Sequence, residues 1–497
     1  MRAMEFAPAA GLDVQLDGLA VKTGQEQYNS PTVFNFFLPD YTPAGAVMVA
    51  GLRAPEAQLA TAPHLVRTLN GLSSLIRNGL TSCDDGFGSE VPMQGMAMRD
   101  CADKRGSADG GFTWVPADAA NATRVVDELS LLLTAGRLNA NNKQLIAGAY
   151  EAKGGGAAGL VAAQELLTLS AEFTSVTANE ITEERPEEIE RASTGKPYQA
   201  LVYIFLNGGA DSYNTIVPLE NCHSTDLYNE YAMLRTDLAM PKSQLLPIDT
   251  NRSMHRQPCL TFGVHEDFPI LKQMYDEGDA AVLANIGPLV EPLDDKYDYM
   301  MRRKLVPFSL FAHNAQQQNT QTVHAQEMDA SGVLGRVFAA LRGPGYKTAG
   351  YSVAGNAMVL GAPGTADPII VGNNGAANLE TYRYYDVYRA EIDEMTKSYS
   401  AGVFADTHTQ HVKNSLEGIE KFAQGLQGGE LSVEFPNTQL GRQLATIARV
   451  IKSRSYIGAE VDGFFCQIGG FDSHGDFFTT ISNKFGEIND AVGAFIE

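Results

Sequence analysis

The sequence has few cysteines, few basic residues for its acids and no long apolar run. Its 5 cysteines in 497 residues exclude a small disulfide-framed scaffold, and the absence of any Cys-x-x-Cys pair argues against a cysteine zinc site. The 37 Lys and Arg against 59 Asp and Glu give a formal net charge of -22. Because phosphate contacts need clustered basic side chains, we expect no nucleic-acid binding. No apolar run approaches the length needed to cross a bilayer, so we expect no membrane span.

The chain is long enough for two or three domains, and its composition is that of an ordinary globular protein. Apolar residues make up 44% and charged residues 19%. The first residues, Met1 to Val14, contain no uninterrupted apolar segment, so no signal peptide is visible in this chain. Composition alone leaves the cellular compartment and the oligomeric state open.

The first region, residues 1–176, is predicted to be mainly helical. Apolar residues recur at helical spacing around Leu129 and again around Leu167, and Gly154-Gly155-Gly156 separates the two helices. The next region, 177–198, is rich in glutamate around Pro186 and cannot bury a core, which predicts a solvated acidic linker.

From residue 199 the pattern changes to that of an α/β protein. Three short apolar runs, 201–206, 280–286 and 461–468, each end at glycine. Such runs predict strands buried on both faces of a parallel sheet, and helical patterns such as 440–451 lie between them. Strands that alternate with helices indicate a doubly wound α/β domain over residues 199–497.

Polar side chains follow the first and third of these predicted strands. Asp472 and His474 are two residues apart, so in extended backbone both side chains point to the same side. Asp211 follows the first predicted strand and is a candidate third ligand. A carboxylate with an imidazole suits a divalent metal: zinc, or manganese where more oxygen ligands complete the shell. The alternative is structural: the glycines make tight turns, and the Asp and His cap neighbouring helices.

Other candidates carry less information. His408 and His411 lie three residues apart near Asp406, and we interpret them as the exposed face of a polar helix. Cys222 and Cys259 flank an excursion between the first two predicted strands, so we expect a disulfide between them in an oxidising compartment. Cys83 and Cys101 flank another loop and are a second candidate pair.

Five segments of the second region resemble the family called domain of unknown function 1501. They are Phe205–Pro218 (FLNGGADSYNTIVP), Gln257–His265, Leu310–Asn314, Gly332–Arg336 and Gly469–His474, and they occur in the family's order. That family is similar to the alkaline phosphatase and sulfatase superfamily. The resemblance implies a three-layer α/β/α sandwich, often with two metal ions, and puts Asp211, Asp472 and His474 on metal-ligand positions.

The first region resembles another family, domain of unknown function 1800, of which it contains a C-terminal part. The resemblance rests on Ser30–Tyr41 (SPTVFNFFLPDY), Gly51–Gln58 and Glu172-Phe173. Members of both families often carry export signals, which implies an extracytoplasmic or secreted setting.

Two departures from the first family bear on activity. Many relatives have a serine, a possible nucleophile, directly before the histidine of the second segment, and here that position is Ala312. Ser309 is the substitute candidate, with Ser212 as an alternative, and His313 is its candidate catalytic partner. Relatives also continue beyond the third segment with further ligands, so the α/β domain is expected to be incomplete at its C-terminal end.

The leading hypothesis is therefore a metal-dependent phosphate or sulfate ester hydrolase-like protein that is inactive or weakly active as this chain. Its substrate would be a small-molecule or polymer ester. The alternative is a non-catalytic secreted or surface protein that keeps the hydrolase fold for binding.

Overall fold

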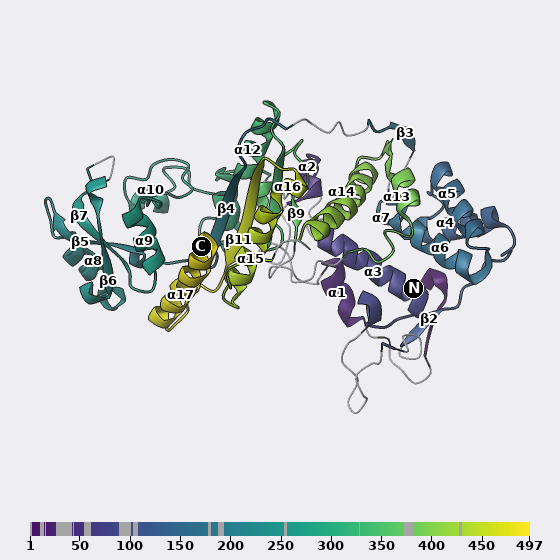
Figure 1. Cartoon of the computed structure of the whole chain (residues 1–497), viewed down its shortest axis with the longest axis horizontal. Coiled ribbons are helices and arrows are strands. Elements are labelled where there is room, and N and C mark those ends of the chain that lie inside the picture. The colour runs from purple at the N-terminus through teal and green to yellow at the C-terminus, as the bar shows by residue number, and fades with distance from the viewer. Residues whose placement is uncertain are drawn as a thin grey trace.

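A computed structural model describes residues 2–9, 14, 16–25, 42, 44–53, 61–88, 101–102, 108–176, 180–186, 193–252, 256–327, 329–371, 381–426 and 430–497. Figure 1 shows helices gathered at one end of the molecule, a parallel sheet in the middle and a small antiparallel sheet at the other end. The stretch Ser30–Tyr41, on which one family resemblance rests, lies outside the described residues.

The helical end is built around one large apolar core, with a smaller cluster of Leu75, Leu80 and Phe87 beside it. Helix α4 buries Val125 and Leu129 as its spacing predicts, and α6 buries Leu166 and Leu167. The three glycines from Gly154 separate α5 from α6, which confirms the predicted break. The helices are α1 (Asp17–Thr23), α2 (Ala46–Val49), α3 (Ala62–Asn78), α4 (Ala122–Thr134), α5 (Ala140–Ala152), α6 (Gly156–Leu169) and α7 (Ala171–Thr174), beside a two-stranded sheet of β1 (Phe6–Pro8) and β2 (Gly110–Phe112).

A later stretch of chain completes this helical core. Helices α13 (Arg389–Thr396) and α14 (Val403–Leu426) bring Tyr388, Val412 and Leu416 into contact with it. The region that begins at residue 199 therefore contributes to the core among the N-terminal helices as well as to the cores around its own two sheets.

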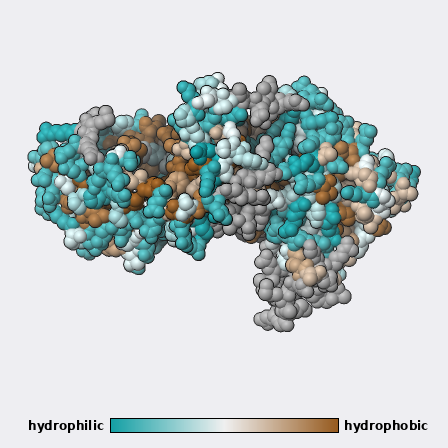
Figure 2. All heavy atoms as spheres, in the orientation of Figure 1, coloured by the Kyte–Doolittle hydropathy of each residue, from teal (hydrophilic) through white to brown (hydrophobic). Residues whose placement is uncertain are grey.

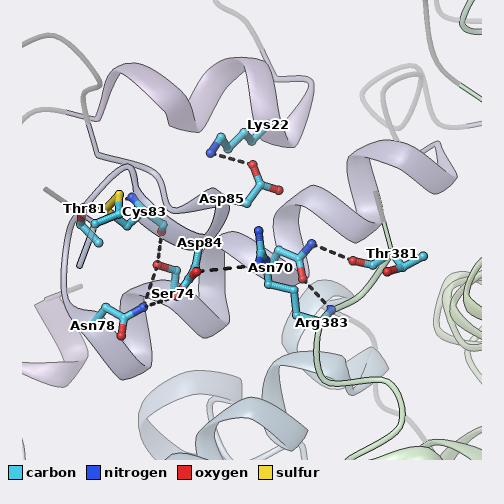
Figure 3. A network of polar contacts seen from close by, with 11 residues as sticks. Lys22, Asn70, Ser74, Asn78, Thr81, Cys83, Asp84, Asp85, Thr381 and Arg383 are labelled. Carbon is cyan, nitrogen blue, oxygen red and sulfur yellow. Dashed lines mark hydrogen bonds and ion pairs between the residues drawn. A yellow bond between two sulfur atoms is a disulfide. The ribbon is translucent and has the colours of Figure 1, made fainter. Parts of the chain in front are cut away.

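Buried polar contacts fasten the two stretches together. Glu165, which is fully buried in α6, accepts two hydrogen bonds from Arg77 of α3, at 2.7 and 2.6 Å, and a third from the Tyr388 hydroxyl at 2.6 Å. Figure 3 shows a second connection, in which Asn70 of α3 donates to the Thr381 carbonyl at 3.1 Å and accepts from the Arg383 amide at 3.0 Å. Because each buried group finds a partner, burial does not leave these charges uncompensated.

The middle of the molecule is a four-stranded sheet in which every pair is parallel. Strand β4 (Gln199–Leu206) pairs along its whole length with β11 (Val461–Ile468). Strand β8 (Thr348–Ser352) lies on the other side of β11, followed by β9 (Ile369–Ile370). This confirms the predicted α/β class with a parallel sheet.

Helices cover both faces of this sheet. Because side chains alternate along a strand, Phe464 packs with α15 (Gln439–Lys452) and α17 (Phe477–Ile496), whereas Phe465 packs on the other face with α12 (Val333–Arg342). The prediction that 461–468 is a fully buried strand is confirmed, since most of β11 is buried.

Two of the strand predictions are wrong. Residues 280–286 form no strand, and Leu283 and Ile286 are 82% and 79% exposed. Strand β4 exists but lies at the edge of the sheet, and Leu201 is 52% exposed. In the described chain β4 pairs only with β11, and the side chains that follow Leu201 are partly buried against the cores on the two faces of the sheet.

Part of the predicted linker is ordered. Strand β3 (Ile181–Glu184) pairs antiparallel with β10 (Ser398–Ser400), and Arg185 forms an ion pair with Asp406 of α14. Three of the four β3 residues are exposed, as expected of a glutamate-rich segment. Residues 177–179 and 187–192 of this region lie outside the described chain.

The third part is an antiparallel sheet in the order β5-β7-β6. The Cys222–Cys259 disulfide, with Cα atoms 3.8 Å apart, joins the ends of β5 and β7 and confirms the prediction. The Cys83–Cys101 disulfide is also present. The strands of this sheet are β5 (Ile216–Cys222), β6 (Leu245–Asp249) and β7 (Cys259–His265). The helices of the chain not yet named are α8 (Leu227–Arg235), α9 (Pro269–Glu277), α10 (Lys296–Met300), α11 (His313–Thr322) and α16 (Arg454–Ile457).

Among the described helices, none combines the length and the apolar character that a membrane crossing requires.

We predict that removing the disulfide with Cys222→Ser and Cys259→Ser lowers the free energy of unfolding by roughly 3–4 kcal/mol. The reason is that the cross-link joins residues 37 apart in the sequence and so restricts the unfolded chain. Urea unfolding of the double variant and the parent measures it. The free cysteine Cys466 supplies a control, Cys466→Ala, in which the cross-link stays intact. Equal stability of parent and double variant would contradict the prediction.

Asp462 gives a prediction about pH. This carboxyl is fully buried at the start of β11, with one oxygen accepting from the Tyr198 hydroxyl at 2.7 Å and the other without a hydrogen-bond partner among the described residues. Burial raises the pKa of Asp462 from 3.8 to about 6, against the opposing effect of the Tyr198 hydrogen bond. A raised folded-state pKa means that stability is present at low pH and is lost as the pH rises through about 6.

The substitution Asp462→Asn should therefore change the free energy of unfolding differently at pH 4 and at pH 8. Its effect should be more favourable at pH 8 by about 2–3 kcal/mol, because only the parent loses stability between the two pH values. Urea unfolding of both proteins at the two pH values measures this. A difference between the proteins that is the same at both pH values would show that the carboxyl ionises without cost.

Candidate functional site

The carboxyl ends of β4 and β11 meet at one edge of the parallel sheet. Asn207 directly follows β4, and its amide donates to the Ile468 carbonyl at the end of β11 at 2.9 Å. Gly208 has a positive φ of 109°, and a Cβ there would lie 3.1 Å from the Asp472 backbone nitrogen. Glycine is needed at this point because the two strand-end loops approach so closely.

Three of the predicted site residues lie together at this edge. His474 Nε2 is 2.9 Å from Asp472 Oδ2, and His313 Nε2 is 3.7 Å from the same oxygen. The three side chains are solvent-accessible, with His474 86%, His313 51% and Asp472 50% exposed. One carboxylate thus stands between two imidazoles, an arrangement that can orient the rings.

Helix α11 begins at His313, so the N-terminus of the helix lies at the site. The residue before the helix is Ala312, whose side chain cannot accept a hydrogen bond, so the first amides of α11 have no side-chain cap. Unpaired amides at a helix start favour a bound anion. Gln317 of α11 donates to the Asn207 side-chain oxygen at 2.6 Å, which ties the helix to the end of β4.

The turn before α11 is strained. Ser309 and Phe311 have positive φ values of 45° and 76°, a region that residues other than glycine rarely adopt. The Ser309 carbonyl accepts from the Ala312 amide at 2.9 Å, and the Ser309 side chain is exposed. Ser309, predicted as a substitute nucleophile, lies four residues before His313, and within the described chain no hydrogen bond joins it to Asp472 or His474.

Asp211 has different partners from those its position predicts. Its carboxylate forms an ion pair with Arg235 at the end of α8 and accepts from the Tyr213 amide at 2.9 Å. The Asp211 side chain is only 12% exposed, so the guanidinium strongly offsets its charge. A cation that approached Asp211 would have to displace Arg235.

The residues present do not match a two-metal centre. Among the described residues, no group of three or more His, Cys, Asp and Glu side chains could hold a metal ion. Asp472 already contacts His474 directly, and Asp211 is occupied by Arg235. Asp472 and His474 have the ligand chemistry of a zinc site, but the described chain offers no second set.

Sequence reasoning missed two contacts that shape this site. Gln317 belongs to a run of three glutamines that predicts nothing by itself, and its role is visible only once α11 is placed beside β4. Arg235 lies 24 residues after Asp211 with no motif to connect them.

Comparisons with known proteins add no evidence about this site. No protein-family model matches the chain, and no curated protein or solved structure matches it. The resemblances to the two families of unknown function therefore stay predictions.

We predict that Ala312→Ser stabilises the protein by about 1 kcal/mol, because a serine oxygen at the N-cap accepts a hydrogen bond from the first turn of the helix. The extended backbone at Ala312 (φ -83°, ψ 125°) suits a capping residue. Urea unfolding measures the gain. Ala312→Val is the matched control, since it adds bulk without an acceptor. If serine and valine changed the free energy of unfolding equally, the first amides of α11 would not be in need of a cap.

Proposed function

We propose that the chain is an ester hydrolase-like protein of the alkaline phosphatase and sulfatase kind, which binds a phosphate or sulfate ester but turns it over weakly. The observation that carries the proposal is the meeting of Asp472, His474 and His313 at the carboxyl edge of a parallel sheet. In open α/β sheets ligands bind at that edge. Helices on both faces of the sheet support a three-layer sandwich of the proposed kind.

The ester would bind through its oxyanion. The uncapped amides of α11 supply partial positive charge, and His313 at the first position of the helix adds a donor. Asp472 lies between this ring and that of His474, with its Oδ2 atom 3.7 Å and 2.9 Å from their Nε2 atoms. Each such contribution is modest at an exposed site, roughly 0.3–1 kcal/mol for a helix N-terminus, so weak binding is expected.

Weak turnover follows from what stands at two positions. Ala312 carries a methyl group where a hydrolytic nucleophile is expected, and a methyl group cannot attack an ester. Asp211, the expected third metal ligand, is neutralised by Arg235. Zinc binding by Asp472 and His474 stays a proposal, and no catalytic step is assigned to it.

The alternative, a non-catalytic binding protein, is favoured by the surface beside the site. The stretch between α9 and α11 exposes several large apolar side chains. Figure 2 shows brown surface around a hollow in this part of the molecule, near α10 of Figure 1. Exposed apolar patches of this kind mark binding surfaces. The residues concerned are Leu283, Ile286, Leu289, Met300, Met301, Leu305 and Phe311.

An oxidising, extracytoplasmic compartment fits both functions. The two disulfides, Cys83–Cys101 and Cys222–Cys259, are of the kind that persists outside the cytosol. Secretion itself is part of the proposal.

The proposal predicts little or no hydrolysis of 4-nitrophenyl phosphate or sulfate by the parent chain, with or without added zinc. Ala312→Ser should raise the rate roughly tenfold or more, because it supplies a hydroxyl at the start of α11 that can attack once a bound ester has replaced it at the helix amides. Ala312→Val is again the control, and Ala312→Ser with His474→Ala should lose the gain.

Two results would overturn parts of this account. Robust turnover by the parent, abolished by His474→Ala, would show that the site is complete without a nucleophile at 312. A failure of Ala312→Ser to hydrolyse either ester, with no binding of them by the parent, would favour the non-catalytic alternative.

A further inference from the structure

An open cavity of about 580 Å³ lies in the helical end of the molecule. Its wall comes from the end of α3, from the end of α5 and from α6, and from the stretch that leads into α13. Small-molecule sites in proteins have volumes of about 300–1,000 Å³, so the cavity is large enough for an organic ligand. It shares no lining residue with the cluster at Asp472, and the inference does not rest on the proposed function.

Buried contacts hold the wall of this cavity in place. Arg77 lines the cavity, and two of its N–H groups donate to the fully buried Glu165. The hydroxyl of Tyr388, from another part of the wall, donates to the same carboxylate at 2.6 Å. Figure 3 shows a further wall residue, Asp84, which accepts from the side-chain amide of Asn78 at 3.2 Å. Because the wall is already ordered, a ligand would bind at little cost in side-chain entropy.

The charges around the cavity leave one positive charge in excess. Three charged side chains line it, those of Arg77, Lys153 and Asp84. Glu165 neutralises the first, and Arg383 lies 3.7 Å from the carboxylate of Asp84. The Lys153 ammonium has no hydrogen bond or ion pair with any residue that the structure describes. In a chain of net charge -22, a cavity with a local positive charge favours an anion over a cation.

Much of the remaining wall is apolar. Ala158 and Val161 of α6 line the cavity together with Val387, which is 49% exposed. The Tyr384 ring adds an aromatic surface, and the guanidinium of Arg77 lies 4.2 Å from the centre of that ring. An apolar wall with a few charged groups is typical of sites that bind small organic molecules. The ligand that fits this wall therefore has an apolar body as well as a charge.

We propose that the cavity binds a small carboxylic acid with an apolar body. The Lys153 ammonium contacts the carboxylate, and Arg77 adds positive potential from the wall. The body of the ligand lies against Val161 and Val387, where its burial removes apolar surface from water. A single negative charge matches the single positive charge in excess, whereas a phosphate dianion would bring a second negative charge close to Asp84.

The experiment is a titration of the full chain with 3-phenylpropionate, followed by ligand-observed NMR. The neutral alcohol 3-phenylpropan-1-ol has the same body without the charge. Lys153→Gln removes the proposed contact, and its control is Lys143→Gln, a lysine of the same helix that pairs with Asp127 and does not line the cavity.

A second pair of variants tests the space itself. Ala158→Phe fills the cavity from an exposed position of α6, so it leaves the packed core unchanged. Its control is Ala157→Phe, at the neighbouring exposed position, which does not line the cavity. Circular dichroism and thermal unfolding confirm that each variant is folded.

We expect one 3-phenylpropionate per chain, bound roughly fivefold more tightly than the alcohol, since an exposed ion pair contributes about that factor. Lys153→Gln should weaken the binding of the carboxylate by roughly the same factor and leave that of the alcohol unchanged. Ala158→Phe should abolish the binding of both compounds, and the two control variants should bind as the parent does.

Four results would overturn the inference. They are no binding of 3-phenylpropionate by the parent, equal affinity for the acid and the alcohol, unchanged affinity in folded Lys153→Gln, and unchanged affinity in folded Ala158→Phe. Loss of binding in His313→Asn, with Lys153→Gln unaffected, would place the carboxylate at the start of α11 and would also overturn it.

Discussion

The parallel pairing of β4 with β11 is the contact on which the candidate site depends. The two strands run in register from Gln199 opposite Val461 to Leu206 opposite Ile468, so they end at the same level. Asn207 and the loop that carries Asp472 then leave the sheet together, and Gly208 lets them touch. Helix α11 is held to this edge by Gln317, which places His313 beside Asp472. These residues come from three distant parts of the sequence, and the pairing of β4 with β11 is what brings them together in space.

The helical end follows a different constraint, which is the need to partner charges that are buried. Glu165 is fully buried and tolerable only because Arg77 and Tyr388 surround its carboxylate. Those partners come from α3 and from the stretch next to α13, so the ion pair also joins two distant segments of chain. His408 and His411 stand out in this setting because their Nε2 atoms are buried without such partners among the described residues.

Much of the fold could be predicted from local pattern, but the site could be predicted only in part. The apolar run at 461–468 and the glycines that follow it indicate a buried strand and a loop, and both are present. The similar run at 280–286 is exposed, because whether an apolar run pairs depends on neighbours that periodicity does not specify. Strand-end reasoning groups Asp211 with Asp472 and His474, whereas in the structure the neighbour of Asp472 and His474 is His313, which helix α11 places there. The diversion of Asp211 to Arg235, and the burial of His408 and His411, depend on how separate helices pack and leave no local signal.

The central claim, that the edge formed by β4 and β11 binds a tetrahedral oxyanion, is tested most directly by a crystal structure of the chain soaked with tungstate, whose anomalous signal locates it unambiguously. The account predicts a tungstate ion at the first turn of α11, within hydrogen-bond reach of its amides and of His313, beside Asp472 and His474. Tungstate bound only elsewhere on the molecule, or none bound while the start of α11 is open to solvent, would contradict it.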